Sequence, residues 1–349
     1  MSGGPYGRGK APERACLKLE NWPEADRRLW LAALAPADPF EDHGGERAGY
    51  SAISNAKTAK GYGRWLTWLT VSGNLDPVTA PQTRITRPRV EAYVQHLRDL
   101  GNGGVTILAR LQELGEAARV FDPLADWSFI NKVASLVRAS TTPVRDKRAK
   151  LALSDQLFAL GLSLMEKAAD EPTPRLAALS YRDGLVIALL ALRPMRRRNL
   201  AGLDLGTTLQ QMGGRWFILF TPEETKTGVP LELPWPEVLV PHLETYLAEH
   251  RPRLVVMTHR WTSPVGDALW VSSHGSPMTQ MALYDQIRQR TREGLGKDVN
   301  PHLFRDAAAT LLAIADPVHV RLAAPLLGHC TLSTTEAHYQ QAQSLSAHR

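Results

Sequence analysis

Near the end of the sequence, a histidine and an arginine stand three residues apart at the start of a predicted helix. They are His302 and Arg305, and the preceding Asn300-Pro301 pair is typical of an N-cap followed by proline at the first helical position. Residues three apart on a helix share a face, so both side chains would project from the first turn. Because helix N-termini present free N–H groups that favour anions, this segment predicts a phosphate-binding site.

Two short motifs follow this predicted helix. Leu326-Leu327-Gly328-His329 closes a second helix, and Thr334-Thr335 stands shortly before Tyr339. A tyrosine phenol, with a reference pKa of about 10, becomes a nucleophile when it loses its proton. Histidines can transfer protons near neutral pH. Together these residue types suit an attack on a phosphodiester.

The order of these motifs is distinctive. His-x-x-Arg, then Leu-Leu-Gly-His, then Thr-Thr-x-x-x-Tyr, all inside the last fifty residues, resemble the C-terminal signature of the tyrosine recombinase (phage integrase) family. Each motif alone occurs in many sequences, but the three in this order are specific. The resemblance implies an enzyme that cleaves and rejoins DNA strands through a 3′-phosphotyrosyl intermediate.

The resemblance also implies where the other catalytic groups lie. In the family, the first catalytic arginine follows a buried helix and is trailed by Glu three residues on and Leu seven residues on, a pattern that Arg196 matches best. Its competitors are Arg193, Arg197 and Arg198. A lysine on a β-hairpin acts as general acid in the family, which points to Lys226. The implied catalytic residues are Arg196, Lys226, His302, Arg305, His329 and the nucleophile Tyr339.

The predicted chemistry explains why these groups are needed. Negative charge builds on the non-bridging oxygens during attack at phosphorus, and two guanidinium groups can clamp them if the fold brings Arg196 and Arg305 together. Lys226 would protonate the leaving 5′-oxygen, while the two histidines supply hydrogen bonds and proton transfer. The phosphotyrosyl bond stores the energy of the broken linkage. The sequence shows no Gly-rich phosphate loop with lysine and no carboxylate cluster for magnesium, so no cofactor, ATP or metal is expected.

Three positions depart from the family pattern. Asn199 stands at the usual Glu position, which deprives Arg196 of a charged partner there. Asp306 stands directly after the second arginine, where the family commonly has His. Such an acid either orients a neighbouring arginine or histidine, or weakens phosphate binding. Tyr339 falls one residue later than the commonest spacing, where His338 sits instead, and no other tyrosine lies nearby.

The elements that must position these groups are mostly helices. An apolar run predicts a buried helix over residues 176–192, and clustered arginines directly follow it. Branched and aromatic residues predict β-strands over 216–220 and 229–233, on either side of Lys226. Further helices are expected over 238–250 and 279–291, separated by a loop-like segment at 251–275 with a possible strand at 268–271.

The first half of the chain is expected to be a set of short helices. Apolar spacing predicts a helix of about twenty residues from Ser51, then helices over 87–100, 105–120 and 127–137, and a short helix or docking arm at residues 29–31. This arrangement resembles the four-helix, SAM-like core-binding domain of the same family. The expected fold class is mainly α (α+β), with a small antiparallel β-sheet in the catalytic domain. The expected parts are a partly flexible N-terminal arm (1–46), the core-binding domain (47–138), a basic linker (139–152) and the catalytic domain (153–349).

Positive charge is concentrated in one segment. Residues 51–150 hold 15 Lys+Arg against 8 Asp+Glu, and the rest of the chain balances to within one charge. A basic segment suits attraction to DNA phosphates, although it equally describes a solvated face. The candidates for DNA contact are Lys57, Lys60, Arg64, Arg145, Lys147, Arg148, Lys150 and Arg288, with Arg290 and Arg292 nearby.

Composition excludes several other classes of protein. The 349 residues suffice for two domains, and 44% hydrophobic and 22% charged residues describe a globular protein. Two cysteines, Cys16 and Cys330, provide neither a disulfide framework nor zinc-ligand spacing. No apolar run approaches the length of a membrane span or of a signal-peptide core. We therefore expect no membrane partner, and we expect the protein to lie in a bacterial cytoplasm or nucleoid.

The function predicted from these observations is site-specific DNA recombination or integration, as performed by a mobile element. By family analogy, the expected partners are double-stranded DNA, three further copies of the chain in a tetramer on two sites, and accessory DNA-binding proteins. Two alternatives stay open. A type IB topoisomerase shares the catalytic residues but relaxes DNA, and a catalytically weak DNA-binding regulator would carry Asn199 and Asp306 as marks of decay.

Overall fold

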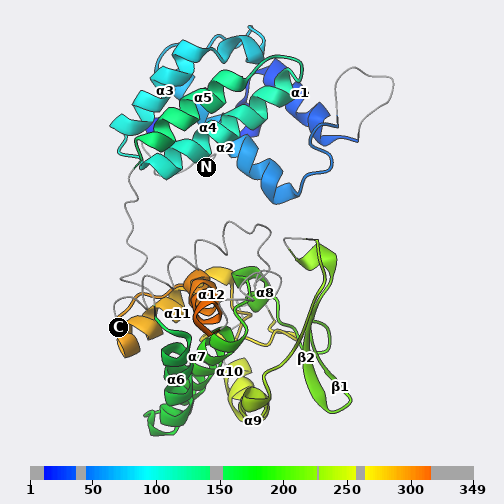
Figure 1. The fold of residues 1–349 in the computed structure, drawn as a ribbon. Coiled ribbons are helices and arrows are strands. Elements are labelled where there is room, and N and C mark those ends of the chain that lie inside the picture. The colour runs from blue at the N-terminus through cyan, green and yellow to red at the C-terminus, as the bar shows by residue number, and fades with distance from the viewer. Residues whose placement is uncertain (1–11, 37–44, 142–151, 226–227, 257–263, 316–349) are drawn as a thin grey trace. The chain divides into compact units, whose positions relative to one another are not determined.

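The chain folds into two compact units, each with its own hydrophobic core. The computed structural model describes residues 12–36, 45–141, 152–225, 228–256 and 264–315, with side chains up to Ala308 in the last helix. The units are Met1–Arg145 and Asp146–Arg349 (Figure 1). Their division falls inside the segment expected as a linker, of which residues 142–151 lie outside the described part. The described chain is mainly helical with one small sheet, so the predicted fold class is confirmed.

The described part of the first unit contains five α-helices. They are α1 (Glu24–Leu34), α2 (Ala52–Val71), α3 (Arg87–Asp99), α4 (Gly104–Phe121) and α5 (Ser128–Ala139). Helices α2 to α5 are the four that apolar spacing predicts from Ser51 onward. Residues 29–31 lie in α1, where Trp30 is buried in the same core as Trp65 and Tyr93. Helix α4 packs against α1, α2 and α5 and is central to this unit.

A buried ion pair ties α1 to the rest of the first unit. Arg84, at the end of the 3-10 turn Pro81–Arg84, donates from Nη2 to Oδ1 of Asp26 at 2.6 Å and from Nη1 to Oδ2 at 2.9 Å. Tyr62 of α2 donates its hydroxyl to the same Oδ2 at 2.6 Å. Burial, followed by the neighbouring Asp26 carboxylate, raises the pKa of Tyr62 well above its usual value, so the phenol stays a neutral donor. One carboxylate therefore joins three elements.

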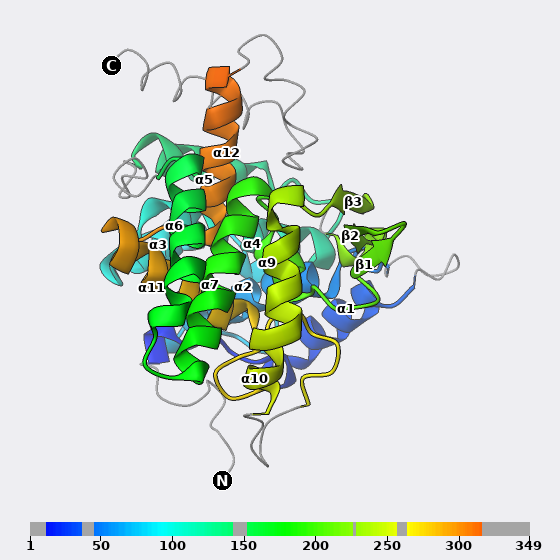
Figure 2. The ribbon, with the colours of Figure 1, turned by 90° about the horizontal axis from the view of Figure 1, so that it is seen from below.

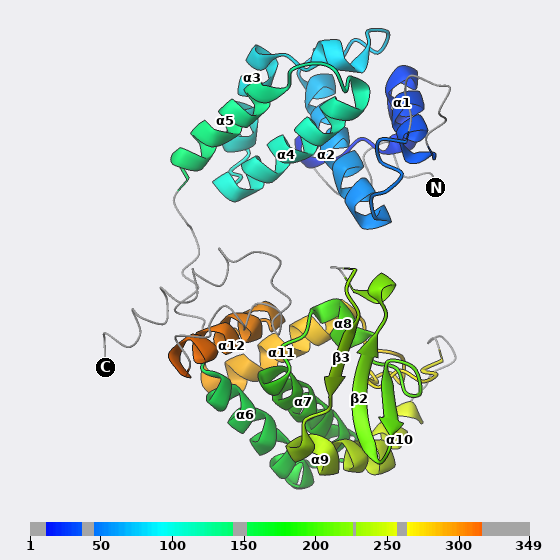
Figure 3. The same cartoon turned by 45° about the vertical axis from the view of Figure 1, so that its right-hand side comes forward.

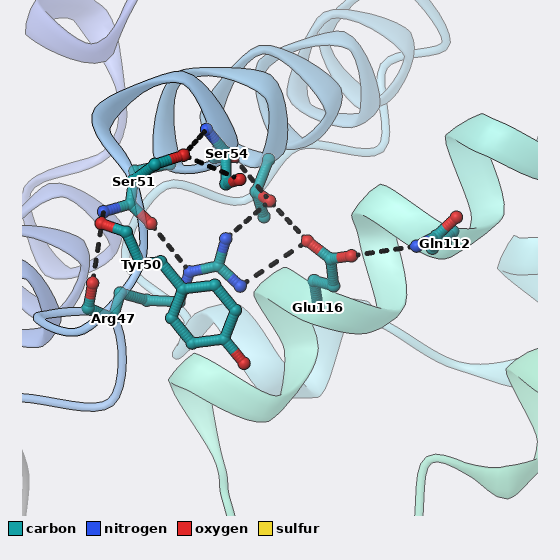
Figure 4. Close-up of polar contacts among 8 residues, drawn as sticks. Arg47, Tyr50, Ser51, Ser54, Gln112 and Glu116 are labelled. Atoms are coloured by element: carbon teal, nitrogen blue, oxygen red, sulfur yellow. Dashed lines mark hydrogen bonds and ion pairs between the residues drawn. The ribbon is translucent and has the colours of Figure 1, made fainter. Parts of the chain in front are cut away.

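A second polar cluster fixes the start of α2 against α4 (Figure 4). The Arg47 guanidinium donates to Thr58 Oγ1 at 2.9 Å and to Asn55 Oδ1 at 3.0 Å. It also pairs with Glu116 of α4 at 3.5 Å, and Glu116 in turn accepts from the Thr58 hydroxyl at 2.5 Å. Ser51 caps the helix by accepting from Ser54 N at 3.2 Å. The loop before α2 is thereby held to two helices.

The centre of the second unit is the buried helix α7 (Pro174–Leu192), as the apolar run predicts. It packs along α6 (Ser154–Glu166), and Figure 2 shows the two helices side by side. Two glycines let the backbones approach. A Cβ atom on Gly161 would lie 2.7 Å from the Gly184 carbonyl oxygen, and one on Gly184 would lie 2.6 Å from the Gly161 carbonyl oxygen. Any side chain at either position would force the helices apart.

A three-stranded antiparallel sheet lies beside these helices (Figure 3). Its order is β1 (Leu209–Met212), β2 (Arg215–Phe220), β3 (Leu231–Pro234). The two predicted strands correspond to β2 and β3, whereas β1 lacks the branched and aromatic residues that signal a strand. A tight turn at Gly213 and Gly214, both with positive φ, joins β1 to β2 and places Leu209 opposite Ile218 in the core.

The remaining elements of the described part are helical. They are α8 (Arg197–Ala201), α9 (Val240–Thr245), a π-helical turn (Tyr246–His250), α10 (Arg251–Val255), α11 (Gln280–Leu295) and α12 (Pro301–Ala315). The prediction of a helix ending at residue 250 was wrong, because Pro252 falls in the first turn of α10, where proline is tolerated. The possible strand at 268–271 forms only isolated bridges at Ala268 and Val271. No helix in the described part is both long and apolar enough to cross a membrane.

The ion pair between Asp26 and Arg84 should be necessary for the stability of the first unit. Replacing Arg84 by Met is expected to lower the free energy of unfolding by about 3–5 kcal/mol, because a buried carboxylate loses its cation. Arg87→Met is the matched control, since the Arg87–Glu91 pair is solvent-exposed and worth about 0–1 kcal/mol. Urea unfolding followed by circular dichroism measures both. Losses of equal size would contradict this assignment.

Candidate active site

The turn that follows α7 carries Arg196 to the rim of the core. Arg193 N donates to the Leu189 carbonyl at 2.7 Å, and the Arg193 guanidinium donates to the carbonyl of Pro234 at 3.3 Å, which ties the turn to the end of β3. Met195 is buried beneath it. Arg196 is the N-cap residue of α8, with an extended backbone and a half-buried side chain. Arg196 thus lies just after the buried helix α7, where the chain leaves the core.

Helix α12 begins as the sequence predicts. Asn300 Oδ1 accepts hydrogen bonds from His302 N at 3.0 Å and from Leu303 N at 3.4 Å, and Pro301 occupies the first helical position. Leu303 and Phe304 are buried in the core of the second unit, which fixes the rotation of the helix. The His302 side chain consequently faces solvent and is 68% exposed.

The structure brings Arg196 and Arg305 together. The Arg305 guanidinium donates to the carbonyl of Pro194 at 2.9 Å, two residues before Arg196. Burial, and then repulsion by Arg196, lowers the pKa of Arg305 to about 10, while Asp306 acts in the opposite direction. Both guanidinium groups are therefore within electrostatic reach of each other, and Arg305 remains charged at neutral pH. An anion between them would relieve the repulsion.

The competing arginines lie in other surroundings. Arg193 donates to Pro234, and Arg197 lies 5.3 Å from the ring centroid of Tyr284 and contacts the sulfur of Met281 at 3.5 Å. Arg198 is exposed. Of these four residues, Arg196 is the one whose charge acts on Arg305, which favours it as the first arginine of the predicted set.

Both ends of the connection that carries Lys226 are fixed. After β2, the 3-10 turn Pro222–Glu224 is capped by Glu224, whose carboxylate accepts from Thr221 N at 2.9 Å. The hydroxyl of the buried Thr225 donates to the carbonyls of Val229 at 2.8 Å and Pro222 at 3.1 Å. Lys226 itself lies outside the described residues, as do His329 and Tyr339. Their predicted roles stay predictions.

Asn199 and Leu203, the positions that follow Arg196 in the family pattern, are both buried. The Asn199 amide nitrogen has no hydrogen-bond partner within the described chain. Its side chain lines a cavity of about 490 Å³ together with Asp204, Glu224 and Thr279 at the start of α11. Burial, and then the charges of Asp267 and Glu224, raise the pKa of Asp204. This cavity has no counterpart among the sequence predictions, because its walls come from segments far apart in the chain.

The predicted DNA-contacting residues lie on α2, on α11 and in a segment outside the described residues. Lys57 and Lys60 are exposed on α2, and Arg64 follows one turn later on the same helix. Arg110 of α4 pairs with the buried Glu113, and Arg64 and Lys57 are further cationic neighbours of this carboxylate. Burial raises the pKa of Glu113. The sequence predictions did not name the Arg110–Glu113 pair, although a spacing of three residues places both side chains on one face of a helix. Outside the described residues lie Arg145, Lys147, Arg148 and Lys150.

The cations of α11 already have acidic partners. Arg288 donates twice to Asp298, at 2.6 and 2.5 Å, and Arg292 approaches the same carboxylate at 3.5 Å. Arg290 donates to the buried Asp183 of α7 at 2.9 Å. These pairs support α11 itself. The contact of Arg288 with DNA stays a prediction.

Comparison with known proteins gives one family. The sequence matches the phage integrase family over residues 162–345. The tyrosine recombinase XerD of Staphylococcus aureus is 28% identical over 174 residues, covering 49% of this chain and 55% of that protein, so the match spans about half the length of this relative. XerD of Corynebacterium glutamicum is 26% identical over 314 residues, covering 88% and 91%. The Tn1549 transposon integrase, solved with transposon right end DNA, is similar in fold, with a TM-score of 0.52, 16% identity and coverage of 92% of this chain and 98% of that one.

The paired arginines should bind a tetrahedral anion without DNA. Sulfate is expected to raise the melting temperature of the protein relative to sodium chloride at equal ionic strength, by the equivalent of about 1–3 kcal/mol at 10 to 100 times its Kd. Arg305→Met should lose most of this effect. Arg288→Met is the matched control and should retain it, because Arg288 is paired with Asp298. Equal sulfate effects in both variants would contradict a shared anion site at Arg196 and Arg305.

Proposed function

The chain belongs to the phage integrase family, and we propose that it is a site-specific DNA recombinase that cuts and rejoins strands through a 3′-phosphotyrosyl intermediate. The observation that supports this most directly is the proximity of Arg196 and Arg305, whose guanidinium groups repel each other at the start of α12. Arranged in this way, two forked cations suit the two non-bridging oxygens of one phosphodiester. The exposed His302 on the same helical turn supplies a further hydrogen-bond donor.

In the proposed cleavage step, the Tyr339 oxygen attacks the scissile phosphorus. The bond from phosphorus to the 5′-oxygen breaks as the tyrosyl–phosphorus bond forms, and Lys226 gives a proton to the departing 5′-oxygen. Arg196 and Arg305 stabilise the negative charge on the non-bridging oxygens. His302 and His329 supply hydrogen bonds and take part in proton transfer as Tyr339 loses its proton.

The rejoining step reverses the same chemistry. A 5′-hydroxyl of another strand attacks the phosphotyrosyl bond, and the tyrosine leaves. Because the covalent intermediate conserves the energy of the original linkage, exchange of strands requires neither ATP nor metal. We propose that Lys226 acts in both directions, as acid in cleavage and as base in rejoining.

The proposed substrate is double-stranded DNA. The first unit, through Lys57, Lys60 and Arg64 on α2, and the cations of residues 145–150 are proposed to contact the phosphate backbone. By family analogy, four copies act on two sites, with accessory DNA-binding proteins as further partners. We further propose that the protein acts on DNA in a bacterial cytoplasm, as the recombinase of a mobile element.

A covalent adduct tests the proposal. Incubation with nicked target DNA should give a protein–DNA band on a denaturing gel, absent in Tyr339→Phe. Arg196→Ala and Arg305→Ala should each lose several kcal/mol of transition-state stabilisation, roughly 10²–10³-fold in rate, with DNA binding largely kept. Binding without an adduct on an authentic site would instead support a regulator, and relaxation without exchange between paired sites would support a type IB topoisomerase.

The role of Lys226 can be separated from a general loss of structure. Lys226→Ala is expected to cleave ordinary DNA on the order of 10²–10⁴-fold more slowly, because the leaving oxygen lacks its proton donor. DNA with sulfur at the bridging 5′-position should restore the rate, since a thiolate leaves without protonation. Arg305→Ala is the comparison, because its defect should persist on both substrates. If sulfur fails to rescue Lys226→Ala, this lysine is not the general acid.

A further inference from the structure

A buried carboxylate lies directly beside the paired arginines. Asp306 follows Arg305 in α12 and is only 5% exposed. Aspartates are almost never buried to this degree unless other groups compensate their charge, because transfer of a carboxylate out of water is costly. The fold therefore places a carboxyl group where it also gathers cations.

Asp306 lies one helical turn below His302. The distance from His302 Nε2 to Asp306 Oδ1 is 4.0 Å, and the two residues share a face of α12. The imidazole is mostly exposed while the carboxylate is buried, so the acid sits beneath the histidine. A charge in this position favours conformations of His302 in which Nε2 points back toward the helix.

Asp306 also acts on Arg305. Burial and the charge of Arg196 both lower the pKa of Arg305, and Asp306 is the neighbour that raises it. The charged groups that act on the Arg305 guanidinium thus come from the turn before α8 and from α12 itself. Without the carboxylate, two cations would face each other with less compensation in a partly desolvated place.

We propose that Asp306 is a positioning residue for strand cleavage, whose carboxylate holds His302 and balances the charge of the Arg196–Arg305 pair. This inference rests on the proposed function, because an effect on cleavage requires that these residues contact the scissile phosphate. The sequence leaves open whether Asp306 orients its neighbours or weakens phosphate binding. Its position beneath the exposed His302, with Oδ1 4.0 Å from the imidazole Nε2, favours orientation.

The dependence of cleavage on pH distinguishes this role from simple support of the helix. Asp306→Asn keeps the size of the side chain and removes its charge. It should cleave nicked DNA about 10- to 100-fold more slowly at neutral pH, because the phosphate-binding groups lose their alignment. The defect should grow toward about pH 9.5, since the pKa of Arg305 falls further and its guanidinium loses its charge at lower pH.

The measurement is the rate of cleavage at subsaturating protein, which reports the titration of the free enzyme. Dividing each variant's rate by that of the wild type removes the pH dependence that the two proteins have in common. Asp306→Glu retains the charge and should show a ratio that is independent of pH. Asn300→Ala removes the N-cap of the same helix, so it should lower the melting temperature and also give a ratio that is independent of pH.

A pH-independent ratio in Asp306→Asn, or an equal defect in Asp306→Glu, would overturn the proposal and make Asp306 a structural residue. Circular dichroism verifies folding, and Asp306→Ser replaces Asp306→Asn if the latter does not fold. Stabilisation by sulfate over the same pH range provides a readout without DNA, and it should decline at lower pH in Asp306→Asn than in the wild type. Absence of any adduct from the wild type, with this sulfate difference present, would mean that the proposed function fails while the effect of Asp306 on the arginines stands.

Discussion

The second unit holds two like charges close together at its candidate site. Arg305 is buried, hydrogen-bonded to the carbonyl of Pro194 and repelled by Arg196, all at the junction between α7, α8 and α12. Repulsion between the two guanidinium groups disfavours this arrangement, and the frame of surrounding contacts has to offset it. In the proposed reaction, cations that are already in position would not have to reorganise when negative charge develops on the phosphate.

The frame is built from buried charges as well as apolar contacts. Within α7, Asp183 accepts from both Arg182 and Arg290, and Arg182 donates to the Val271 carbonyl at 2.6 Å. These bonds join α7 to α11 and to the segment before it. A buried pair of this kind adds little net stability relative to apolar residues, but the loss of either partner leaves a buried charge uncompensated. The first unit uses the same device, with Asp26 and Arg84.

The sequence predicts the parts of the fold whose signals are local. Asn300-Pro301 predicts the start of α12, and the apolar run predicts α7, because capping and periodicity operate within a few residues. Contacts between distant residues leave no such signal. Arg290 reads as a cation available to DNA, yet its partner Asp183 lies 107 positions earlier. The proximity of Arg196 and Arg305 likewise followed from family resemblance and not from any pattern along the chain, and the helical turn after Pro252 was missed because a proline usually ends a helix.

The contact between α6 and α7 restricts how this protein can diverge. At Gly161 and Gly184, each backbone occupies the space that a methyl group on the other would need. Neither position can accept even alanine while its partner helix stays in place. A single substitution at either position should therefore destabilise the protein. Change would require coordinated shifts of both helices, and with them of the turn that carries Arg196. Among homologous sequences, small residues at these two sites should therefore be inherited together.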